Sequence, residues 1–346
     1  MAVLAIVTSS PPAVEGGHLV IARSLVRAAR ECGHDSHLVI TPECQFGRQL
    51  SSYLQTFRTN VHTATGQRVD QVISLRFPSY AVRHRAHVCW LNHTMREYYD
   101  LWPRFAAQLS LQGRAKERCK RAATRAADRW LLTKNVSEVV AQSETVQRRL
   151  LNDLGVASAV LLPPPPQREY RCEEYGDYLF AVSRLTPLKR LDLLVRALAA
   201  PAAGKARAII AGEGESRQGL EHLIASLGLS GRVTLAGRLS DERLLDHLAR
   251  CRAVCFPTFD EDYGLVTGEA FASRKGVITC SDSGGPTELV RHEHTGLVCD
   301  PTPGALATAI GRVMDDRSFA EKLGAAAADR AATLSWPDAV RRLVIV

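Results

Sequence analysis

Short apolar runs alternate with longer segments of helical periodicity along most of the chain. Residues 2–8 are apolar, and across residues 18–32 the apolar positions recur every three or four residues, which predicts a strand followed by a helix. Residues 36–41 return as a second strand and complete a strand–helix–strand unit. Further strands are predicted at 70–75, 87–92, 138–142 and 159–162, with a helix at 145–154. This alternation predicts an α/β fold built on parallel sheets.

Four consecutive prolines, Pro163 to Pro166, interrupt the alternation. Because proline lacks a backbone N–H and restricts its own backbone angle, the run predicts a stiff, extended connector. A second alternation begins at Tyr178, with strands near 207–211, 232–236, 253–256, 277–280 and 297–299 and helices near 188–200, 215–228, 240–250, 303–315, 318–333 and 336–346. We therefore predict one domain over 1–166 and a second over 167–335.

The overall composition is that of an ordinary globular protein, since 46% of the 346 residues are hydrophobic and 23% are charged. No apolar stretch approaches the roughly 18 to 20 residues that span a bilayer. The first apolar run lacks the basic segment of a signal peptide and indicates a strand. The nine cysteines form no CxxC pair, so we expect reduced thiols. These features predict a cytoplasmic protein, with peripheral attachment at the inner face of the membrane as an alternative.

The net charge of +8 favours anionic ligands, which include nucleoside diphosphates, nucleic acid and anionic membrane surfaces. Nucleic acid is disfavoured because the chain has no helix-turn-helix, zinc-finger or RNP pattern. An NAD enzyme is disfavoured because GxGxxG is missing after the first strand of either half, and Walker A, GxSxG and HExxH are absent as well. His292 and His294 have the spacing of ligands but fall in a polar loop, so we expect no metal site.

The stretch from Phe256 to Phe271 carries the strongest indication of chemistry. An apolar run stops at Pro257, turns through acidic residues and restarts as a helix at Gly264. Glu261 falls at the carboxyl end of the predicted strand, and Glu269 follows about one and a half helical turns later. Both carboxylates can therefore face one crevice of the kind in which parallel α/β sheets bind ligands. A bare pair of glutamates is more often only a solvated face.

Two neighbouring segments point to the same edge of a sheet. The Gly-rich turn over 281–288 follows the next strand, and the loop over 183–190 follows the first strand of the second half. Arg184 and Lys189 in this second loop could hold a pyrophosphate by charge-assisted hydrogen bonds, with the lysine as point charge and the arginine as fork. Ordinary solvated surface charge is the alternative for this pair.

These segments resemble the nucleotide-sugar-binding core of family 4 retaining glycosyltransferases. The motifs Pro257-Thr-x-Asp-Glu, Gly264-Leu-Val, Gly268-Glu-Ala and Gly284-Gly-x-x-Glu match that family's EGFGLxxxEAxA…GGxxExV pattern. Ser183-Arg-Leu-Thr-Pro-Leu-Lys matches its (G/S)RLxxxKG pattern. The resemblance is strongest over 178–300, moderate over 1–42 and 134–166, and thin over 43–130.

The resemblance implies a GT-B fold, in which two Rossmann-like domains face each other across a cleft. The helix over 336–346 would return to the first domain, which would bind the acceptor, while the second would bind the donor. The implied activity is metal-independent transfer of a hexosyl group, with retention, from a UDP- or GDP-linked sugar to a glycan, lipid-linked or small-molecule acceptor. It also implies a place in bacterial glycan biosynthesis and no cofactor beyond the nucleotide sugar.

The resemblance also assigns residue roles. Arg184 and Lys189 would neutralise the departing diphosphate, Glu269 would hold the ribose, and Glu261 would hold hydroxyls of the donor sugar. His93, at a predicted strand end, would lie near the reacting sugar, although a lone histidine there is more often a turn residue. The remaining donor-binding positions are Gly16, Gly17, Gly212, Gly214, Gly237, Arg238, Gly264, Leu265, Val266, Gly284 and Gly285.

Two departures from the family pattern affect these expectations. Arg190 stands where the family usually has glycine, and we expect it to add charge to the loop without removing Arg184 or Lys189. The family sequence AxGxPVV is replaced by Ala272-Ser-Arg-Lys-Gly-Val-Ile, which is expected to alter that turn but not the carboxylates.

Basic residues at 114, 118, 121, 125 and 129 form one stripe at helical spacing. The opposite face, with Ala115, Cys119, Ala122, Ala126 and Trp130, is apolar and small. A solvated helix face is the favoured interpretation, and a surface for an anionic acceptor or membrane is the alternative.

Rival functions remain open from the sequence. A nucleotide-sugar 2-epimerase or a phosphorylase on the same fold is the enzymatic alternative. A non-catalytic nucleotide-sugar-binding subunit of a larger complex is the other.

Overall fold

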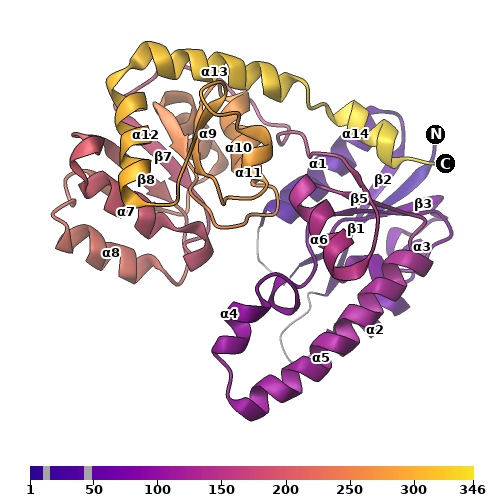
Figure 1. Cartoon of the computed structure of the whole chain (residues 1–346). Helices are drawn as coiled ribbons and strands as arrows, with labels where there is room; N and C mark the ends of the chain where they lie inside the picture. The colour runs from indigo at the N-terminus through magenta and orange to yellow at the C-terminus, as the bar shows by residue number, and fades with distance from the viewer. Residues whose placement is uncertain (11–15, 43–48) are drawn as a thin grey trace. The chain divides into compact units, whose positions relative to one another are not determined.

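The computed structural model describes residues 1–10, 16–42 and 49–346. Its internal contacts divide the chain into two compact units (Figure 1). Unit 1 comprises Met1–Pro166 together with Ser335–Val346, and unit 2 comprises Gln167–Leu334. The segment 335–346 is therefore packed with the N-terminal part of the chain.

Unit 1 is a six-stranded parallel sheet in the order β2-β1-β3-β4-β5-β6. The strands are β1 (Val3–Ser10), β2 (Asp35–Pro42), β3 (Gln71–Ser74), β4 (His87–Leu91), β5 (Glu138–Ala141) and β6 (Ala159–Val160). The helices are α1 (Gly17–Glu31), α2 (Gln49–Arg58), α3 (Val61–Thr65), α4 (Trp102–Ala107), α5 (Leu111–Trp130), α6 (Glu144–Leu154) and α14 (Trp336–Leu343). Short turns η1 (Ser79–Ala81) and η2 (Arg96–Tyr98) and a π-helical turn η3 (Leu131–Asn135) complete it.

Unit 2 is a second six-stranded parallel sheet, in the order β12-β11-β10-β7-β8-β9. Its strands are β7 (Tyr178–Val182), β8 (Arg207–Ala211), β9 (Val233–Gly237), β10 (Ala253–Cys255), β11 (Val277–Cys280) and β12 (Gly296–Cys299). Its helices are α7 (Leu191–Ala199), α8 (Arg217–Ser226), α9 (Asp241–Arg250), α10 (Leu265–Ala272), α11 (Pro286–Leu289), α12 (Pro303–Asp315) and α13 (Arg317–Ala332). The predicted pair of Rossmann-like domains is confirmed.

Helix α14 is fixed to unit 1 by side chains at both of its ends. The Trp336 ring lies edge-on to Trp90, with 6.2 Å between ring centroids, and its Nε1 donates to the Pro165 carbonyl at 2.8 Å. At the other end, Gln71 Nε2 donates to the Leu343 carbonyl at 2.6 Å. Between these two ends the helix packs against α1.

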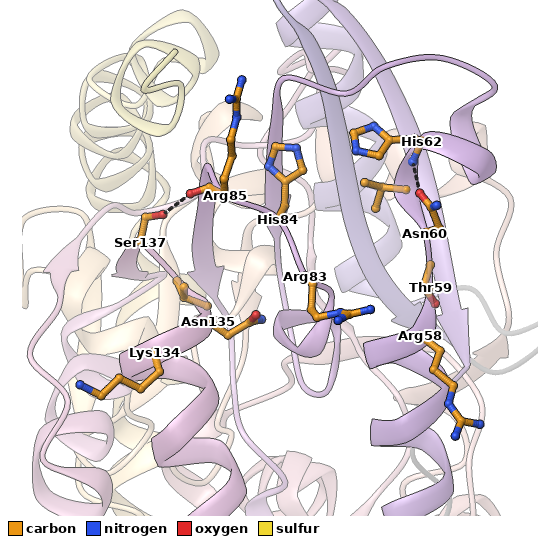
Figure 2. A pocket seen from close by; sticks show the side chains of 12 residues that line it. Arg58, Thr59, Asn60, His62, Arg83, His84, Arg85, Lys134, Asn135 and Ser137 are labelled. Atoms are coloured by element: carbon orange, nitrogen blue, oxygen red, sulfur yellow. Dashed lines mark hydrogen bonds between the residues drawn. The ribbon is translucent and has the colours of Figure 1, made fainter.

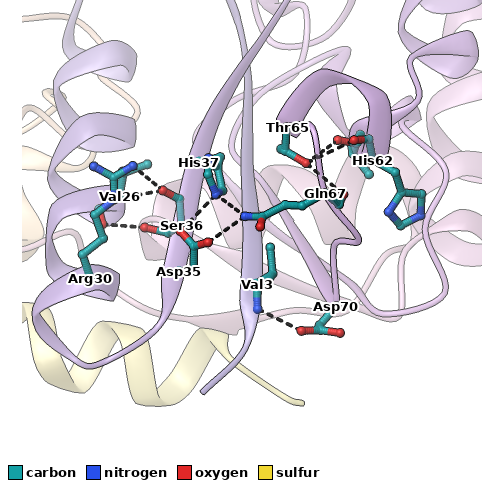
Figure 3. A network of polar contacts seen from close by, with 11 residues as sticks. Val3, Val26, Arg30, Asp35, Ser36, His37, His62, Thr65, Gln67 and Asp70 are labelled. Carbon is teal, nitrogen blue, oxygen red and sulfur yellow. Dashed lines mark hydrogen bonds and ion pairs between the residues drawn. The ribbon is translucent and has the colours of Figure 1, made fainter.

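The amino ends of β1 and β2 are joined by a polar network (Figure 3). Gln67 Nε2 donates to Asp35 Oδ2 at 2.6 Å, and the Val3 N–H donates to Asp70 Oδ2 at 2.9 Å. Ser36 Oγ donates to the Val26 carbonyl at 2.7 Å, which ties β2 to α1. The hydrogen bond from Gln67 lowers the pKa of Asp35 because it stabilises the carboxylate. These contacts fix how β1, β2 and α1 enter the sheet.

Helix α5 differs from the favoured interpretation, in which its basic stripe is a solvated face. Its buried residues are polar, Thr124 and Asp128. Arg121 lies over the Trp102 ring and donates to the Tyr98 carbonyl at 2.7 Å, so part of the basic stripe is packed. Ala115, Cys119, Ala122 and Ala126 are exposed, and Trp130 is 53% exposed. In α5 the buried face is therefore the one whose side chains form hydrogen bonds, and the spacing of apolar residues does not reveal it.

The centre of this packing is a buried carboxylate that accepts three tyrosine hydroxyls. Tyr53 and Tyr80 donate to Asp128 Oδ1 at 2.5 Å, and Tyr99 donates to Oδ2 at 2.6 Å. Burial raises the pKa of Asp128, while the three hydroxyls act against that rise. Both oxygens are occupied by the chain itself, so this network anchors α5 to unit 1.

Candidate active site

The predicted donor-binding residues of unit 2 lie at or after the carboxyl ends of five adjacent strands, β11, β10, β7, β8 and β9. Parallel strands present their carboxyl ends at one edge, which is where α/β sheets bind ligands. The topology therefore gathers segments that are up to a hundred residues apart in the sequence at one edge of the sheet.

The loop after β7 holds the two predicted phosphate-binding cations. Arg184 is exposed, and its guanidinium has no partner among the described residues. Lys189 closes the short turn Pro187–Lys189, and its Nζ donates to Glu261 Oε2 at 2.5 Å. The Lys189 side chain is 13% exposed and that of Glu261 is 19% exposed. An ammonium carries three donors, so two remain for a ligand when Glu261 is bound.

Arg190 adds no free charge to this loop, contrary to the expectation. Its guanidinium makes a bidentate pair with Asp282, at 2.8 Å to Oδ2 and 2.6 Å to Oδ1. It also donates to the backbone carbonyls of Pro257 and Thr258. The backbone φ of +47° at Arg190 lies in the left-handed region, which explains why glycine suits this position in the family pattern. The arginine cross-links three neighbouring loops.

Glu261 is held through its backbone by the loop after β11. Its N–H donates to the Ser283 carbonyl, and its own carbonyl accepts from the Gly285 N–H, both at 2.8 Å. A Cβ at Gly284 would lie 2.5 Å from the Glu261 oxygen, so the close approach of the two loops requires glycine there. The Gly285 amide, predicted to support the donor, is thus engaged by the chain.

Glu269, on α10, is buried at 5% exposure and meets residues that the sequence did not indicate. Arg168 Nη1 donates to Glu269 Oε1 at 2.6 Å, and the Tyr170 hydroxyl lies 3.3 Å from the same oxygen. Oε2 has no partner among the described residues. Burial raises the pKa of Glu269 to about 7, against the opposing effect of Arg168. Arg168 and Tyr170 follow the proline run in a segment without periodicity, so no sequence signal identified them.

The loop after β8 lies between the loop after β7 and the end of β9. The Gly212 N–H donates to the Gly237 carbonyl at 2.7 Å. A Cβ on Gly212 would lie 1.8 Å from the Ser183 oxygen, so packing alone requires glycine at this position. Gly214 takes a φ of +157° beside Leu185. Arg238 is exposed, with no partner among the described residues.

Helix α10 begins at the predicted restart. Gly264 precedes it with a left-handed φ of +81°, and Leu265 and Val266 form its half-buried first turn. At the far end Arg274, which stands at the glycine of the family pattern, takes a left-handed φ of +56°. The neighbouring Lys275 is fully buried, with Nζ 3.9 Å from the centroid of the Tyr175 ring and 3.3 Å from Cys172 Sγ.

The remaining predicted residues belong to unit 1. His93 follows β4, is half-buried, and its Nδ1 lies 2.7 Å from the Thr94 carbonyl. Gly16 is the extended residue that precedes α1, and Gly17 is exposed at the start of that helix. All three follow carboxyl ends of strands of the unit 1 sheet. The structure therefore places them at one edge of their own sheet.

The described part of the chain contains no group of three or more His, Cys, Asp or Glu side chains arranged to hold a metal. His292 instead accepts a hydrogen bond from the Val298 N–H through Nδ1, at 3.0 Å. The cysteines of the described ranges are free thiols. Over the same ranges, every helix falls short of the length or the hydropathy that crossing a membrane requires.

Comparison with known proteins shows which protein family this chain resembles. Residues 168–330, nearly all of unit 2, match the family model of glycosyl transferases group 1. This part of the chain belongs to that family. The predicted resemblance to family 4 glycosyltransferases is confirmed.

Curated relatives agree with the family. The D-inositol 3-phosphate glycosyltransferase of Nocardioides sp. is 32% identical over 192 residues, which covers 50% of this chain and 42% of the relative. The enzyme of the same name from Kineococcus radiotolerans is 30% identical over 234 residues, covering 57% of this chain and 54% of the relative. The matches thus span about half or less of these relatives.

Solved structures of the GT-B type share the fold over the whole chain. Anabaena HepE in complex with UDP and glucose is 18% identical, with a TM-score of 0.72 and coverage of 98% of this chain and 97% of that one. Sucrose-phosphate synthase from Thermosynechococcus elongatus is also 18% identical, with a TM-score of 0.75 over 98% and 97% of the two chains. WaaG, a glycosyltransferase involved in lipopolysaccharide biosynthesis, is 15% identical, with a TM-score of 0.72 over 99% of both chains.

Proposed function

We propose that this protein transfers a hexosyl group from a nucleoside diphosphate sugar to a hydroxyl acceptor with retention of configuration. The observation that carries the proposal is the carboxyl edge of the unit 2 sheet. There, Lys189 contacts Glu261, Arg184 lies in the same loop as Lys189, and Glu269 follows on the next helix. Two cations suit a diphosphate, and two carboxylates suit the hydroxyls of the sugar and the ribose.

The donor phosphates would lie against Arg184 and the two unused donors of Lys189. As the bond to the sugar breaks, negative charge grows on the diphosphate, and both cations stabilise it. These residues supply charge that a divalent metal supplies in other transferases, so we propose metal-independent catalysis. The Lys189–Glu261 pair would couple the phosphate to the sugar, because Glu261 is held by the same ammonium.

Retention follows from the roles given to the carboxylates. Inversion needs a general base on the face opposite the leaving group, and double displacement needs a carboxylate nucleophile at the anomeric carbon. Glu261 and Glu269 are here assigned to hydroxyl groups of the donor. The departing phosphate, held by Arg184 and Lys189, is left to accept the proton of an acceptor that attacks on the same face.

UDP is the first nucleotide to test, because HepE is solved in complex with UDP-glucose and TarM in complex with UDP and α-GlcNAc-glycerol. GDP-linked sugars are the second choice.

The curated relatives named for D-inositol 3-phosphate make a small phosphorylated polyol one acceptor class, beside glycans and lipid-linked acceptors. We place the acceptor side, with His93, in unit 1 and the donor side in unit 2, and the reaction in the cytoplasm as a step of bacterial glycan synthesis.

Peripheral membrane contact would use α5. Arg118 and Arg129 are exposed on this helix, as is the Trp130 ring. Because Arg121 and Arg125 are packed against unit 1, the informative variant is Arg118→Glu with Arg129→Glu. This variant should lose association with anionic vesicles at low salt while it keeps donor hydrolysis. Association that survives the double change would leave α5 as a solvated helix.

The proposal is tested by measuring release of nucleoside diphosphate from UDP-, GDP-, ADP- and dTDP-sugars in the presence of EDTA. One donor class should be hydrolysed, and Lys189→Ala should slow its hydrolysis at least about tenfold. Lys205→Ala is the matched control, since Lys205 is exposed and precedes β8 at the opposite edge of the sheet. Interconversion of UDP-sugars or formation of sugar phosphate without acceptor would favour an epimerase or phosphorylase. Tight donor binding without turnover would favour a binding subunit.

A further inference from the structure

A hollow of about 570 Å³ opens on unit 1, away from the residues to which the sequence assigned a role. Three segments line it, residues 58–62, 83–85 and 134–137 (Figure 2). The first joins α2 to α3, the second precedes β4, and the third joins the end of α5 to β5.

The hollow lies at the amino edge of the unit 1 sheet. Strands β4 and β5 begin at His87 and Glu138, directly after two of the lining segments, and the two strands are parallel. His93 follows the other end of β4. A strand of this length separates the two edges by about 15 Å, because each residue advances the chain by about 3.3 Å. The hollow is therefore distinct from the carboxyl edge that holds His93.

The lining is strongly basic. Its described residues include three arginines, a lysine and two histidines, and none of them is acidic. Arg58, Arg85 and Lys134 are exposed, and their side chains have no partner in the described part of the chain. In Figure 2, Arg85 and Lys134 stand on one side, Arg58 stands on the other, and Arg83 and His84 lie between them. Unpaired cations around one concave surface raise the local concentration of anions.

Neutral contacts hold the base of the hollow in place. The guanidinium of Arg83 lies over the Phe57 ring, 4.6 Å from its centroid. Asn135 Nδ2 donates to the carbonyls of Tyr80 and Val82 at 2.9 and 2.8 Å. Asn135 also ends the π-helical turn that follows α5, and such turns occur frequently at functional sites. None of these contacts neutralises a cation, so the charge of the hollow stays available.

The lining chemistry narrows the class of ligand. Guanidinium and ammonium groups suit phosphate oxygens, and the volume suits a small molecule. Nucleobases bind such grooves by stacking on aromatic rings. No Phe, Tyr or Trp lines this hollow in the described ranges, its two histidine rings, His62 and His84, lie against each other, and Arg83 covers the nearby Phe57 ring. We propose that this basic hollow is a second ligand site, which binds a compact molecule with closely spaced phosphate groups. Such groups belong to free polyphosphorylated metabolites and to phosphorylated lipid headgroups.

The test measures binding of inorganic tripolyphosphate to the full chain by calorimetry at about physiological salt. The triple variant Arg58→Ala, Arg85→Ala, Lys134→Ala should bind at least about 30-fold more weakly, because it loses three charge-assisted contacts. A matched control, Arg196→Ala, Lys205→Ala, Lys322→Ala, removes the same charge from exposed, unpaired positions of unit 2 and should bind within about threefold of the parent.

The double variant Arg184→Ala, Lys189→Ala should retain the affinity, which separates this site from the proposed donor site. A parallel arm uses vesicles with and without phosphoinositide. Binding that only the first triple variant loses supports the proposal, and the arm in which it appears identifies a free metabolite or a lipid headgroup. Absence of binding in both arms, equal losses in both triple variants, or tighter binding of oligouridylate than of tripolyphosphate would overturn it.

Discussion

Within the described residues, unit 1 and unit 2 each bury one carboxylate among hydrogen-bond donors, and the two sites differ in how many carboxylate oxygens the chain itself occupies. In unit 1, both oxygens of Asp128 accept tyrosine hydroxyls, two at Oδ1 and one at Oδ2. In unit 2, Arg168 and Tyr170 both approach Oε1 of Glu269 and leave Oε2 without a partner in the described ranges. Burial raises the pKa of both carboxyl groups.

The contrast separates an anchor from a ligand site. A buried carboxylate whose two oxygens both accept hydrogen bonds from the protein cannot also bind a substrate. Its role is to join the elements that carry the donors. A buried carboxylate with one open oxygen carries a desolvation penalty that a ligand hydroxyl can relieve. Asp128 is therefore assigned to stability, and Glu269 to donor binding.

The largest effect should come from removing the anchor. Asp128→Ala leaves three tyrosine hydroxyls without an acceptor in the interior and should lower the free energy of unfolding by about 3–5 kcal/mol. Asp153→Ala, which breaks the half-exposed pair with Arg125, is the matched control and should lower it by about 1 kcal/mol or less. Urea denaturation measures both. Equal effects would mean that the tyrosine network does not hold α5.

The second prediction concerns UDP affinity in place of stability. Glu269→Gln should weaken UDP binding by about 1.5–3 kcal/mol, because hydrogen bonds to a charged acceptor are replaced by weaker ones. Asp128→Asn should leave UDP affinity unchanged although it lowers stability. Calorimetric titration of both variants tests the distinction directly. A loss of affinity in the Asp128 variant alone would reverse the two assignments.

The pH dependence should differ between the parent and Glu269→Gln. The pKa of Glu269 is about 7 in the folded state against an ordinary 4.5, so its contribution to stability is lost as pH rises from about 4.5 to 7. Ribose hydroxyls favour the ionised form, so affinity for a UDP-sugar, whose diphosphate does not titrate between pH 6 and 8, should rise roughly tenfold over that range. The affinity of Glu269→Gln should be flat over that range. A parent titration without this rise would remove Glu269 from the ribose site.

Sequence patterns predicted the parallel α/β architecture and the loops of unit 2 because each motif directly follows an apolar strand. Glu261 and Lys189 could be identified for that reason, since strand ends share one edge. Arg168 could not, because its role depends on a contact with Glu269 that lies 101 residues away. The buried face of α5 was also missed, because apolar periodicity does not register an interior built on Asp128. Short motifs next to strands could thus be predicted from the sequence, whereas polar contacts between residues far apart in the sequence could not.

The smallest effect should come from two arginines that replace glycine at left-handed positions. The Arg274 side chain makes no hydrogen bond or ion pair with the described residues, so Arg274→Gly should relieve backbone strain and raise stability by about 0.5–1 kcal/mol. Arg190→Gly should instead lower stability, because the bidentate pair with Asp282 is lost. Thermal unfolding of both variants measures these changes in stability. A gain in both would show that the Arg190 pair contributes nothing measurable.

In the proposed mechanism, the carboxyl edge of the unit 2 sheet holds the donor. The acceptor then attacks the anomeric carbon on the same face from which the diphosphate departs. The most direct measurement follows donor hydrolysis by proton NMR and identifies the first anomer released, before mutarotation, with water in place of the acceptor. An α-linked UDP-sugar should release the α-anomer, and Lys189→Ala should suppress that release while Lys205→Ala does not. First release of the β-anomer would contradict both the retaining mechanism and the roles given to Arg184, Lys189 and Glu261.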